Sequence, residues 1–159
     1  SEIMKIKMFF LEKKINKEEI LEILNVKSDT SFDEIRDGAL YGEKKKINKL
    51  LSEIELQIED TFFYLNNLSF RIMKLQEIIK LSNGNKDKYE ETIEKMKPPI
   101  FWKDKPIVMQ QVKKWSLDGL ALLTREIGEA ETLIKKNSYL RNDIVVKELI
   151  INLTNKASQ

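Results

Sequence analysis

Hydrophobic residues recur at every third or fourth position along most of the chain, the spacing that places side chains on one face of an α-helix. The longest run of this kind extends from Asp60 to about Leu81. At about 1.5 Å of rise per residue, it predicts a helix roughly 30 Å long. Its apolar positions are Phe62, Phe63, Leu65, Leu68, Ile72, Leu75, Ile78 and Ile79.

Shorter runs with the same spacing predict further helices on both sides of this segment. They fall near residues 3–11, 16–24, 31–42, 44–54, 89–96, 105–115, 116–136 and 143–153. The sequence shows no sustained alternation of apolar and polar residues, the pattern of a half-buried strand. The pattern therefore predicts an all-α fold, a helical bundle of about eight helices without a sheet.

Several residues mark where these helices are expected to begin and end. Ser31 with Glu34 forms a capping box, and Gly42 suits the C-terminal end of the helix that follows. Ser116 and Asp143 are predicted to cap the last two helices.

Two glycines fall inside the helix predicted to follow Ser116. Gly119 and Gly128 each weaken a helix by about 1 kcal/mol relative to Ala. We therefore expect another helix to approach closely at both positions.

The composition narrows the chemistry that the chain can perform. The 159 residues contain neither Cys nor His, which excludes thiol chemistry and removes the commonest general base and metal ligand. The formal net charge of +2 gives no general affinity for polyanions. Apolar runs stay well short of the roughly 20 residues of a membrane span. The sequence also contains neither a secretory signal nor a phosphate-binding glycine motif. We therefore expect a cytoplasmic protein without a membrane segment, and we expect neither a cofactor nor a catalytic site.

A metal site is the enzyme-like alternative that the carboxylates raise. Glu126, Glu129 and Glu131 lie close together in sequence, but a di-metal site in a helical bundle needs inward-pointing carboxylates on several helices and usually a His. Lys135 and Lys136 follow shortly after. A solvated helix face is therefore the favoured interpretation.

The stretch from Lys95 to Trp115 combines lysines with aromatic residues, as single-stranded nucleic-acid binders do. The alternative is that Trp102 and Trp115 anchor a connector into the core while the lysines are solvated. We favour this alternative because the lysines do not share one helix face. The candidate nucleic-acid contacts are Lys95, Lys97, Lys105, Lys113 and Lys114.

The same region also offers candidate contacts to a partner protein. Aromatic residues on an irregular, proline-stiffened segment are effective interface anchors, and the sequence PPIFW has this character. For each single residue, core packing remains the slightly favoured interpretation. The candidate partner contacts are Phe101, Trp102, Lys103, Tyr139 and Leu140.

Several stretches, taken in order, are similar to one known family. KINKEEILEIL is followed by SFDEIRDGALYGEKKKINKLLSEI, then by KPPIFWKDKPIVMQQVKKWS, LDGLALLTREIGEAETLIKKN and IVVKELIINL. The series resembles the lid-to-collar junction and the collar helices of bacterial DNA polymerase III delta subunits. The family phrase D-A-x-x-x-G-x-x-x-x-A-x-x-x-L is matched, with Phe32 upstream, by Asp37, Gly38, Gly42, Ile47 and Leu51. Gly38 and Ile47 stand where the family usually has Ala.

This resemblance implies a domain organisation and a function. Residues 1–28 would be the end of a helical lid domain, and residues 29–159 a helical collar domain. Collars of five clamp-loader subunits pack into a ring, so the implied partners are the other clamp-loader subunits. The implied function is non-catalytic assembly that supports sliding-clamp loading in DNA replication, within a holoenzyme that is a DNA-directed DNA polymerase. The sliding clamp would be contacted only by the family's N-terminal domain, which this sequence does not contain, and DNA contact is expected at most in the full complex.

Overall fold

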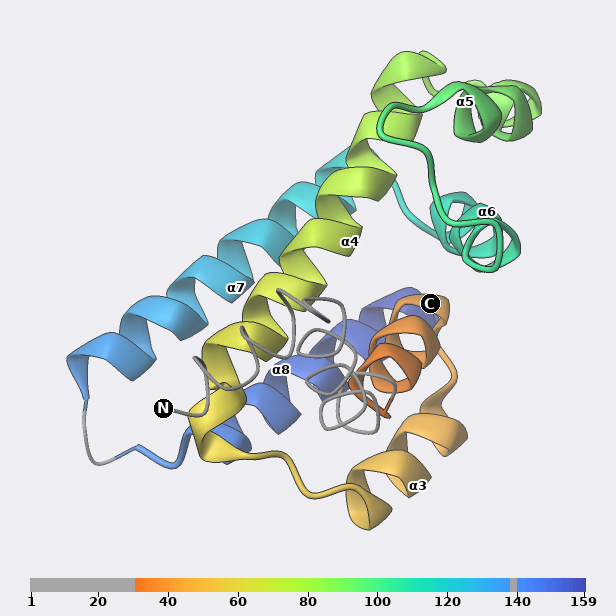
Figure 1. Cartoon of the computed structure of the whole chain (residues 1–159). Coiled ribbons are helices and arrows are strands. Elements are labelled where there is room, and N and C mark those ends of the chain that lie inside the picture. Colours follow the sequence, from red (N-terminus) through yellow and green to blue (C-terminus); the bar gives the residue numbers. More distant parts are fainter. Residues whose placement is uncertain (1–30, 138–139) are drawn as a thin grey trace, which may run out of the picture. The chain divides into compact units, whose positions relative to one another are not determined.

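The computed structural model describes residues 31–137 and 140–159, and the chain divides into two compact units, residues 1–34 and 35–159 (Figure 1). The second unit contains all of the helices between residues 44 and 157. The predicted lid segment, residues 1–28, and the helices predicted near residues 3–11 and 16–24 lie outside the described residues.

All regular structure in the described residues is helical, which confirms the all-α prediction. Residues 31–41 form one helix, and six labelled α-helices follow. They are α3 (Lys44–Glu53), α4 (Thr61–Leu81), α5 (Tyr89–Lys95), α6 (Lys105–Lys114), α7 (Leu117–Lys136) and α8 (Asn142–Ala157). Two short 3₁₀ turns, Ile58–Asp60 and Lys86–Lys88, precede α4 and α5. None of the described helices is both long and apolar enough to cross a membrane.

Helices α4 and α7 lie side by side and supply much of the core, with α8 packed against both (Figure 1). The stripe predicted along α4 is buried from Leu65 to Ile79. At the start of α4 the prediction was too broad, because Phe62 and Phe63 are 40% and 42% exposed. They occupy the first turn, where the helix presents two neighbouring positions to solvent.

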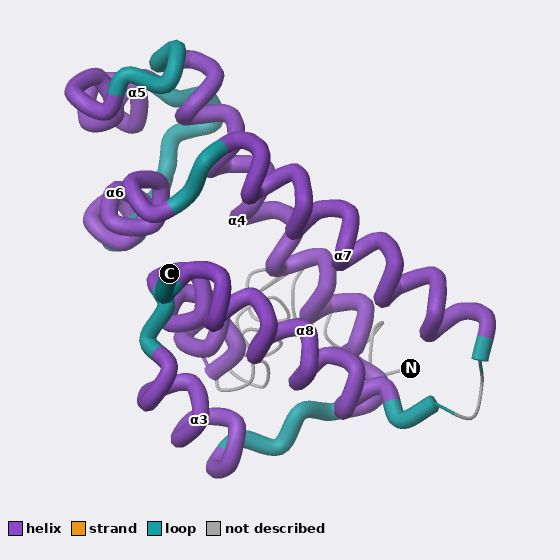
Figure 2. The backbone as a smooth tube through the Cα atoms, turned by 180° about the vertical axis from the view of Figure 1, so that it is seen from behind, coloured by secondary structure: helices purple, strands orange, loops and turns teal. Residues whose placement is uncertain are grey.

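Helices α5 and α6 pack together at the far end of α4, while α3 packs on α8, as Figure 2 shows from behind. Trp115, which directly follows α6, connects that helix to the helix of residues 31–41. Its side chain is only 8% exposed, and its indole Nε1–H donates a hydrogen bond of 2.8 Å to the carbonyl oxygen of Leu40. The interpretation of Trp115 as a core anchor is therefore correct.

The helix ends agree in part with the capping signals. The Ser116 hydroxyl accepts a hydrogen bond of 3.0 Å from the amide of Gly119, which confirms it as the cap of α7. The prediction for Asp143 is wrong, because the cap of α8 is Arg141, two residues earlier, and Asp143 lies in the first turn, paired with Arg141. Ser31 is itself helical, and the residues before it lie outside the described part of the chain.

The prediction that another helix approaches closely at Gly119 and Gly128 is also wrong. A Cβ at Gly128 would meet nothing within 4 Å, and one at Gly119 would meet the Trp115 ring at 3.3 Å rather than a crossing helix. Gly42, which has a φ of +85°, does face another helix. A Cβ there would lie 2.8 Å from the backbone nitrogen of Ser158, just after α8.

These glycines give a matched pair of substitutions. We expect Gly42→Ala to lower the free energy of unfolding by about 2 kcal/mol, because it adds a left-handed strain and a clash with backbone that cannot rotate away. Gly128→Ala should raise the same free energy by about 1 kcal/mol, because its helix position is open to solvent. Urea unfolding followed by circular dichroism measures both, and equal effects of the two changes would contradict the packing at Gly42.

Candidate functional site

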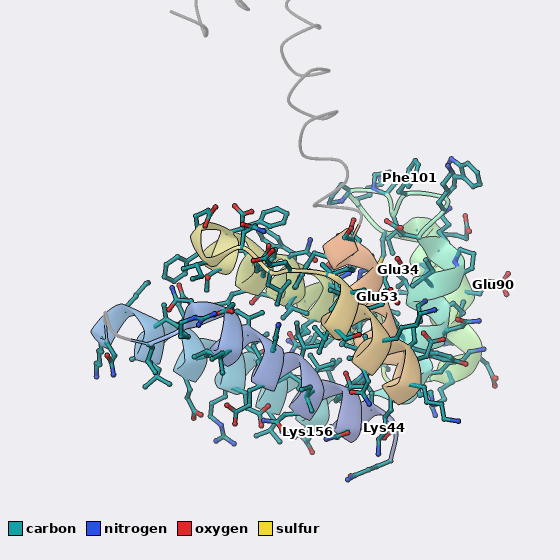
Figure 3. The ribbon with its side chains drawn as sticks, turned by 90° about the horizontal axis from the view of Figure 1, so that it is seen from below. Glu34, Lys44, Glu53, Glu90, Phe101 and Lys156 are labelled. Carbon is teal, nitrogen blue, oxygen red and sulfur yellow. The ribbon has the colours of Figure 1, made fainter. Side chains whose placement is uncertain are left out.

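The connector between α5 and α6, residues 96–104, exposes two large aromatic side chains. Met96 and Ile100 are buried at 3% and 8% exposure and hold the connector on the bundle. Phe101 and Trp102 then lie outside, 57% and 67% exposed, with their ring centroids 5.9 Å apart. Figure 3 shows Phe101 at the outer edge of the helices. The favoured prediction of core packing is therefore wrong for Phe101 and Trp102.

The reason for this exposure is local. The amide of Asp104 donates to the carbonyl oxygen of Phe101 at 2.9 Å, so residues 101–104 form a tight turn, and both rings on this turn are exposed whereas Ile100 just before it is buried. A turn has no helical or strand period, and its sequence therefore carries no signal of which side faces the core.

Two of the candidate lysines are paired with carboxylates. Lys95 and Lys105 form ion pairs of 2.6 Å and 2.9 Å with Glu91 and Glu94, respectively. The hydrogen bond and the charge of Lys95 lower the pKa of Glu91 below its usual value. Two of the five lysines predicted for nucleic-acid contact are therefore paired with carboxylates of α5.

The remaining lysines sit near aromatic rings or in solvent. The Lys103 ammonium lies 5.4 Å from the centroid of Trp102, and that of Lys114 lies 4.9 Å from the ring of Tyr41, both within range of a cation–π contact. Lys97 and Lys113 are exposed.

The other predicted partner residues lie elsewhere. Leu140 is half-buried between α7 and α8, and Tyr139 lies outside the described residues. The α7–α8 loop and the connector are at opposite ends of α7 (Figure 1). The 20 residues of α7 correspond to about 30 Å, so the two sets of predicted partner residues do not form one surface.

A buried polar network lies close to the connector, and the sequence pattern did not indicate it. Asp37 Oδ1 accepts hydrogen bonds from Arg71 Nη1 on α4 at 2.8 Å and from Gln111 Nε2 on α6 at 3.0 Å. Arg71 Nη1 also donates to Gln111 Oε1 at 2.9 Å. Arg36 binds both oxygens of Asp37 and donates to Asn67 on α4. One carboxylate thus links three helices.

This network forms one side of a pocket of about 370 Å3, and the connector forms another side. Phe101 and Phe70 are its aromatic lining residues, and Phe70 is 70% exposed on α4. Phe70 was missed because the sequence analysis searched for the buried stripe, and Phe70 falls between the stripe residues Leu68 and Ile72. A large aromatic residue off the stripe was the signal that could have identified it. Phe70, Phe101 and Trp102 together are called the connector surface below.

The connector also borders a second pocket, of about 590 Å3. Trp102 lines it, together with residues of both charges, including Glu90, Glu94, Lys105 and Lys113. The two adjacent aromatic residues of the connector thus border different pockets, one with mixed charge and one next to the arginine network.

Two of the three carboxylates weighed as a metal site form ion pairs with lysines. Glu126 on α7 pairs with Lys156 on α8, and Glu131 pairs with Lys135 at 3.1 Å. Within residues 31–137 and 140–159, no three Asp or Glu side chains gather in a way that could hold a metal ion.

The network predicts a strong dependence of stability on Asp37. We expect Asp37→Ala to lower the free energy of unfolding by about 3 kcal/mol, because it removes the carboxylate that pairs with both Arg36 and the buried Arg71 guanidinium. Glu148→Ala on the exposed face of α8 is the control and should change stability by less than about 0.5 kcal/mol. Chemical unfolding of both variants measures the difference, and a loss as small as the control's would contradict the linking role of Asp37.

The Glu91–Lys95 pair predicts a pH effect at a single residue. The ion pair exists above the ordinary pKa of a glutamate and is lost as the pH falls through the lowered pKa of Glu91. Lys95→Ala should therefore raise the pKa of Glu91 towards its ordinary value, as measured by the side-chain carboxyl carbon shift in an NMR titration. An unchanged pKa would mean that Lys95 does not pair with Glu91 in solution. The lysine would then be available for contact with a phosphate group.

Comparison with known proteins adds no family to this description. No protein-family model, no curated protein and no solved structure matches the chain. A proposal of function therefore stands on the geometry above and on the sequence resemblance.

Proposed function

We propose that this chain is a non-catalytic assembly module that docks on a partner protein through the connector surface. The observation that carries the proposal is the adjacent exposure of Phe101 and Trp102, at 57% and 67%. Large aromatic side chains that are fixed on a short turn lose little conformational entropy on binding and are typical energetic centres of interfaces. Phe70 extends the apolar area onto the rigid helix α4.

The partner follows from the resemblance to delta subunits of the DNA polymerase III clamp loader. In this proposal the helical bundle is a collar domain, and the partners are the collars of the other subunits in a cytoplasmic replication complex. The all-helical architecture supports it, since a collar packs through helices alone. Trp115 and the Asp37 network stabilise the bundle and hold the connector in place, so that the module presents a preformed surface.

Binding of single-stranded nucleic acid is the second candidate. The contact between Lys103 and Trp102 favours it, because a base could stack on the indole while the ammonium meets a phosphate. The pairing of Lys95 and Lys105 with carboxylates favours protein docking instead, because it removes cations from a continuous phosphate track.

Co-purification with the other clamp-loader subunits of the same organism tests the assembly proposal. We expect a complex of defined mass in light scattering, formed without ATP. Phe101→Ala combined with Trp102→Ala should weaken the complex by roughly 1,000-fold, because central aromatic anchors contribute about 2 kcal/mol or more each.

The matched control is Phe62→Ala combined with Phe63→Ala, another pair of adjacent exposed aromatic residues at the opposite end of α4 from α5 and α6. It should leave the complex unchanged. Equal losses for both pairs would remove the connector surface from its proposed role. Failure of the folded chain to bind any subunit, together with salt-sensitive binding of oligo(dT), would replace the assembly proposal with the nucleic-acid candidate.

A further inference from the structure

Helix α4 is apolar on its exposed side as well as on its buried side. At about 3.6 residues per turn, its exposed positions all fall within an arc of roughly 100° around the helix axis. Five of these eight side chains are large and apolar: Phe62, Phe63, Phe70, Met73 and Leu81. The other three are Asn66, Glu77 and Lys80. These eight residues are called the outer face of α4 below.

The outer face differs from that of an ordinary surface helix. A helix at the surface of a globular protein usually carries polar and charged residues opposite its buried stripe, and a helix that is apolar on all sides is usually buried on all sides. Met73 and Leu81 are nevertheless 57% and 61% exposed. An apolar stripe that follows a helix for about 30 Å is typical of a surface that contacts another protein.

The order of residues along the outer face is complementary to itself in the antiparallel direction. Two copies of α4 can pack antiparallel, at the shallow crossing angle of a coiled coil, about a two-fold axis midway between Phe70 and Met73. Each Phe70 then lies opposite the partner's Met73, and each Phe62 lies opposite the partner's Leu81. Apolar side chains therefore meet at the centre and at both ends of the contact.

The polar residues of the outer face favour the same arrangement. Asn66 lies opposite the partner's Glu77, so its amide can donate a hydrogen bond to that carboxylate, which has lone pairs for this bond as well as for Lys74 at 4.0 Å. Lys80 lies opposite the partner's Phe63, where a cation–π contact is possible. A parallel pairing would instead place Glu77 against Glu77 and Lys80 against Lys80, which like-charge repulsion disfavours.

We propose that the chain forms a two-fold dimer in which α4 packs antiparallel against the α4 of a second copy. This inference goes beyond the proposed function, because it requires no other subunit. A single pair of helices is a small interface, so the dimer is reversible and dissociates on dilution. Phe70 belongs to both the outer face and the connector surface, so the dimer must open before a partner docks there. At dilutions where the chain is monomeric, the tests of dimerisation and docking do not interfere.

Sedimentation velocity of the full chain over a range of concentrations tests this inference. We expect the mass of two chains at high concentration and of one chain at low concentration. Met73→Ala should raise the dissociation constant of the dimer at least about tenfold, because the two-fold axis repeats the lost contact with Phe70 in both copies. The control is Ile151→Ala, which truncates an exposed apolar side chain on α8 and should leave the dissociation constant unchanged.

A charge exchange tests the antiparallel arrangement. Asn66→Glu should raise the dissociation constant at least about tenfold, because it places a second carboxylate opposite the partner's Glu77. Adding Glu77→Lys should restore the dimer, since each new carboxylate would then face an ammonium group of the other copy. Positions 66 and 77 are about 16 Å apart along one helix, so this rescue must act between chains. The control is Asn66→Glu with Glu148→Lys, the same charge change on the exposed face of α8, which should not restore the dimer.

A mass of one chain at every concentration would overturn the dimer and assign the outer face to a different occupant. Self-association that is lost with Phe101→Ala and Trp102→Ala but unaffected by Met73→Ala would place the contact on the connector surface and overturn the role of α4. Equal rescue by Glu77→Lys and Glu148→Lys would overturn the antiparallel arrangement, because the effect would then follow net charge alone. A folded chain that dimerises as expected yet binds no clamp-loader subunit would support this inference and contradict only the proposed function.

Discussion

The arrangement of this bundle depends on one carboxylate. Asp37 lies on the helix of residues 31–41 and accepts hydrogen bonds from Arg71 on α4 and Gln111 on α6. A buried guanidinium is tolerated only when a carboxylate compensates its charge, so the three helices have one favourable mutual arrangement at this point. Apolar packing alone allows helices to slide by small amounts at low cost. A charged hydrogen-bond network of fixed geometry does not.

This constraint extends to the surface. Arg71 also lies 3.9 Å from Asp104, at the end of the connector turn, and Trp115 follows α6 directly with its indole bonded to Leu40. The segment from the connector to α7 is therefore held at both ends. Asp104 at its start lies near Arg71, the partner of Asp37, and Trp115 at its end bonds to the helix that carries Asp37. The exposed rings of Phe101 and Trp102 are presented on a supported turn rather than on a loose loop.

The sequence was most informative where the chain is regular. The period of apolar residues predicted α4 almost to the residue, since its buried stripe repeats over the whole length of the helix. The capping role of Ser116 was equally predictable, because a capping side chain accepts its hydrogen bond from an amide only a few residues further along the chain. Asp143 was misjudged by two positions because the cap of α8 is Arg141, whose side chain makes no capping hydrogen bond and which no capping signal in the sequence marks.

The candidate site was less predictable because its contacts join residues far apart in the sequence. Nothing local to Asp37 indicates Gln111 as its partner, and nothing in the order Phe101–Trp102 indicates which way a turn will face. The aromatic residues of the connector were identified as candidates, yet their exposure emerges only when Met96 and Ile100 are seen to take the buried positions. Identifying Phe70 as a residue of the site required knowing which face of α4 is covered by other helices.

The contrasting environments of Trp102 and Trp115, the only two tryptophans, have a spectroscopic consequence. The exposed indole of Trp102 emits from a water-like environment and is open to iodide quenching. The indole of Trp115 is shielded and fixed by its bond to Leu40, and its emission changes when the bundle opens. The chain thus contains two optical reporters, one for its surface and one for its interior. Replacement of either tryptophan by Phe would allow the other to be observed alone.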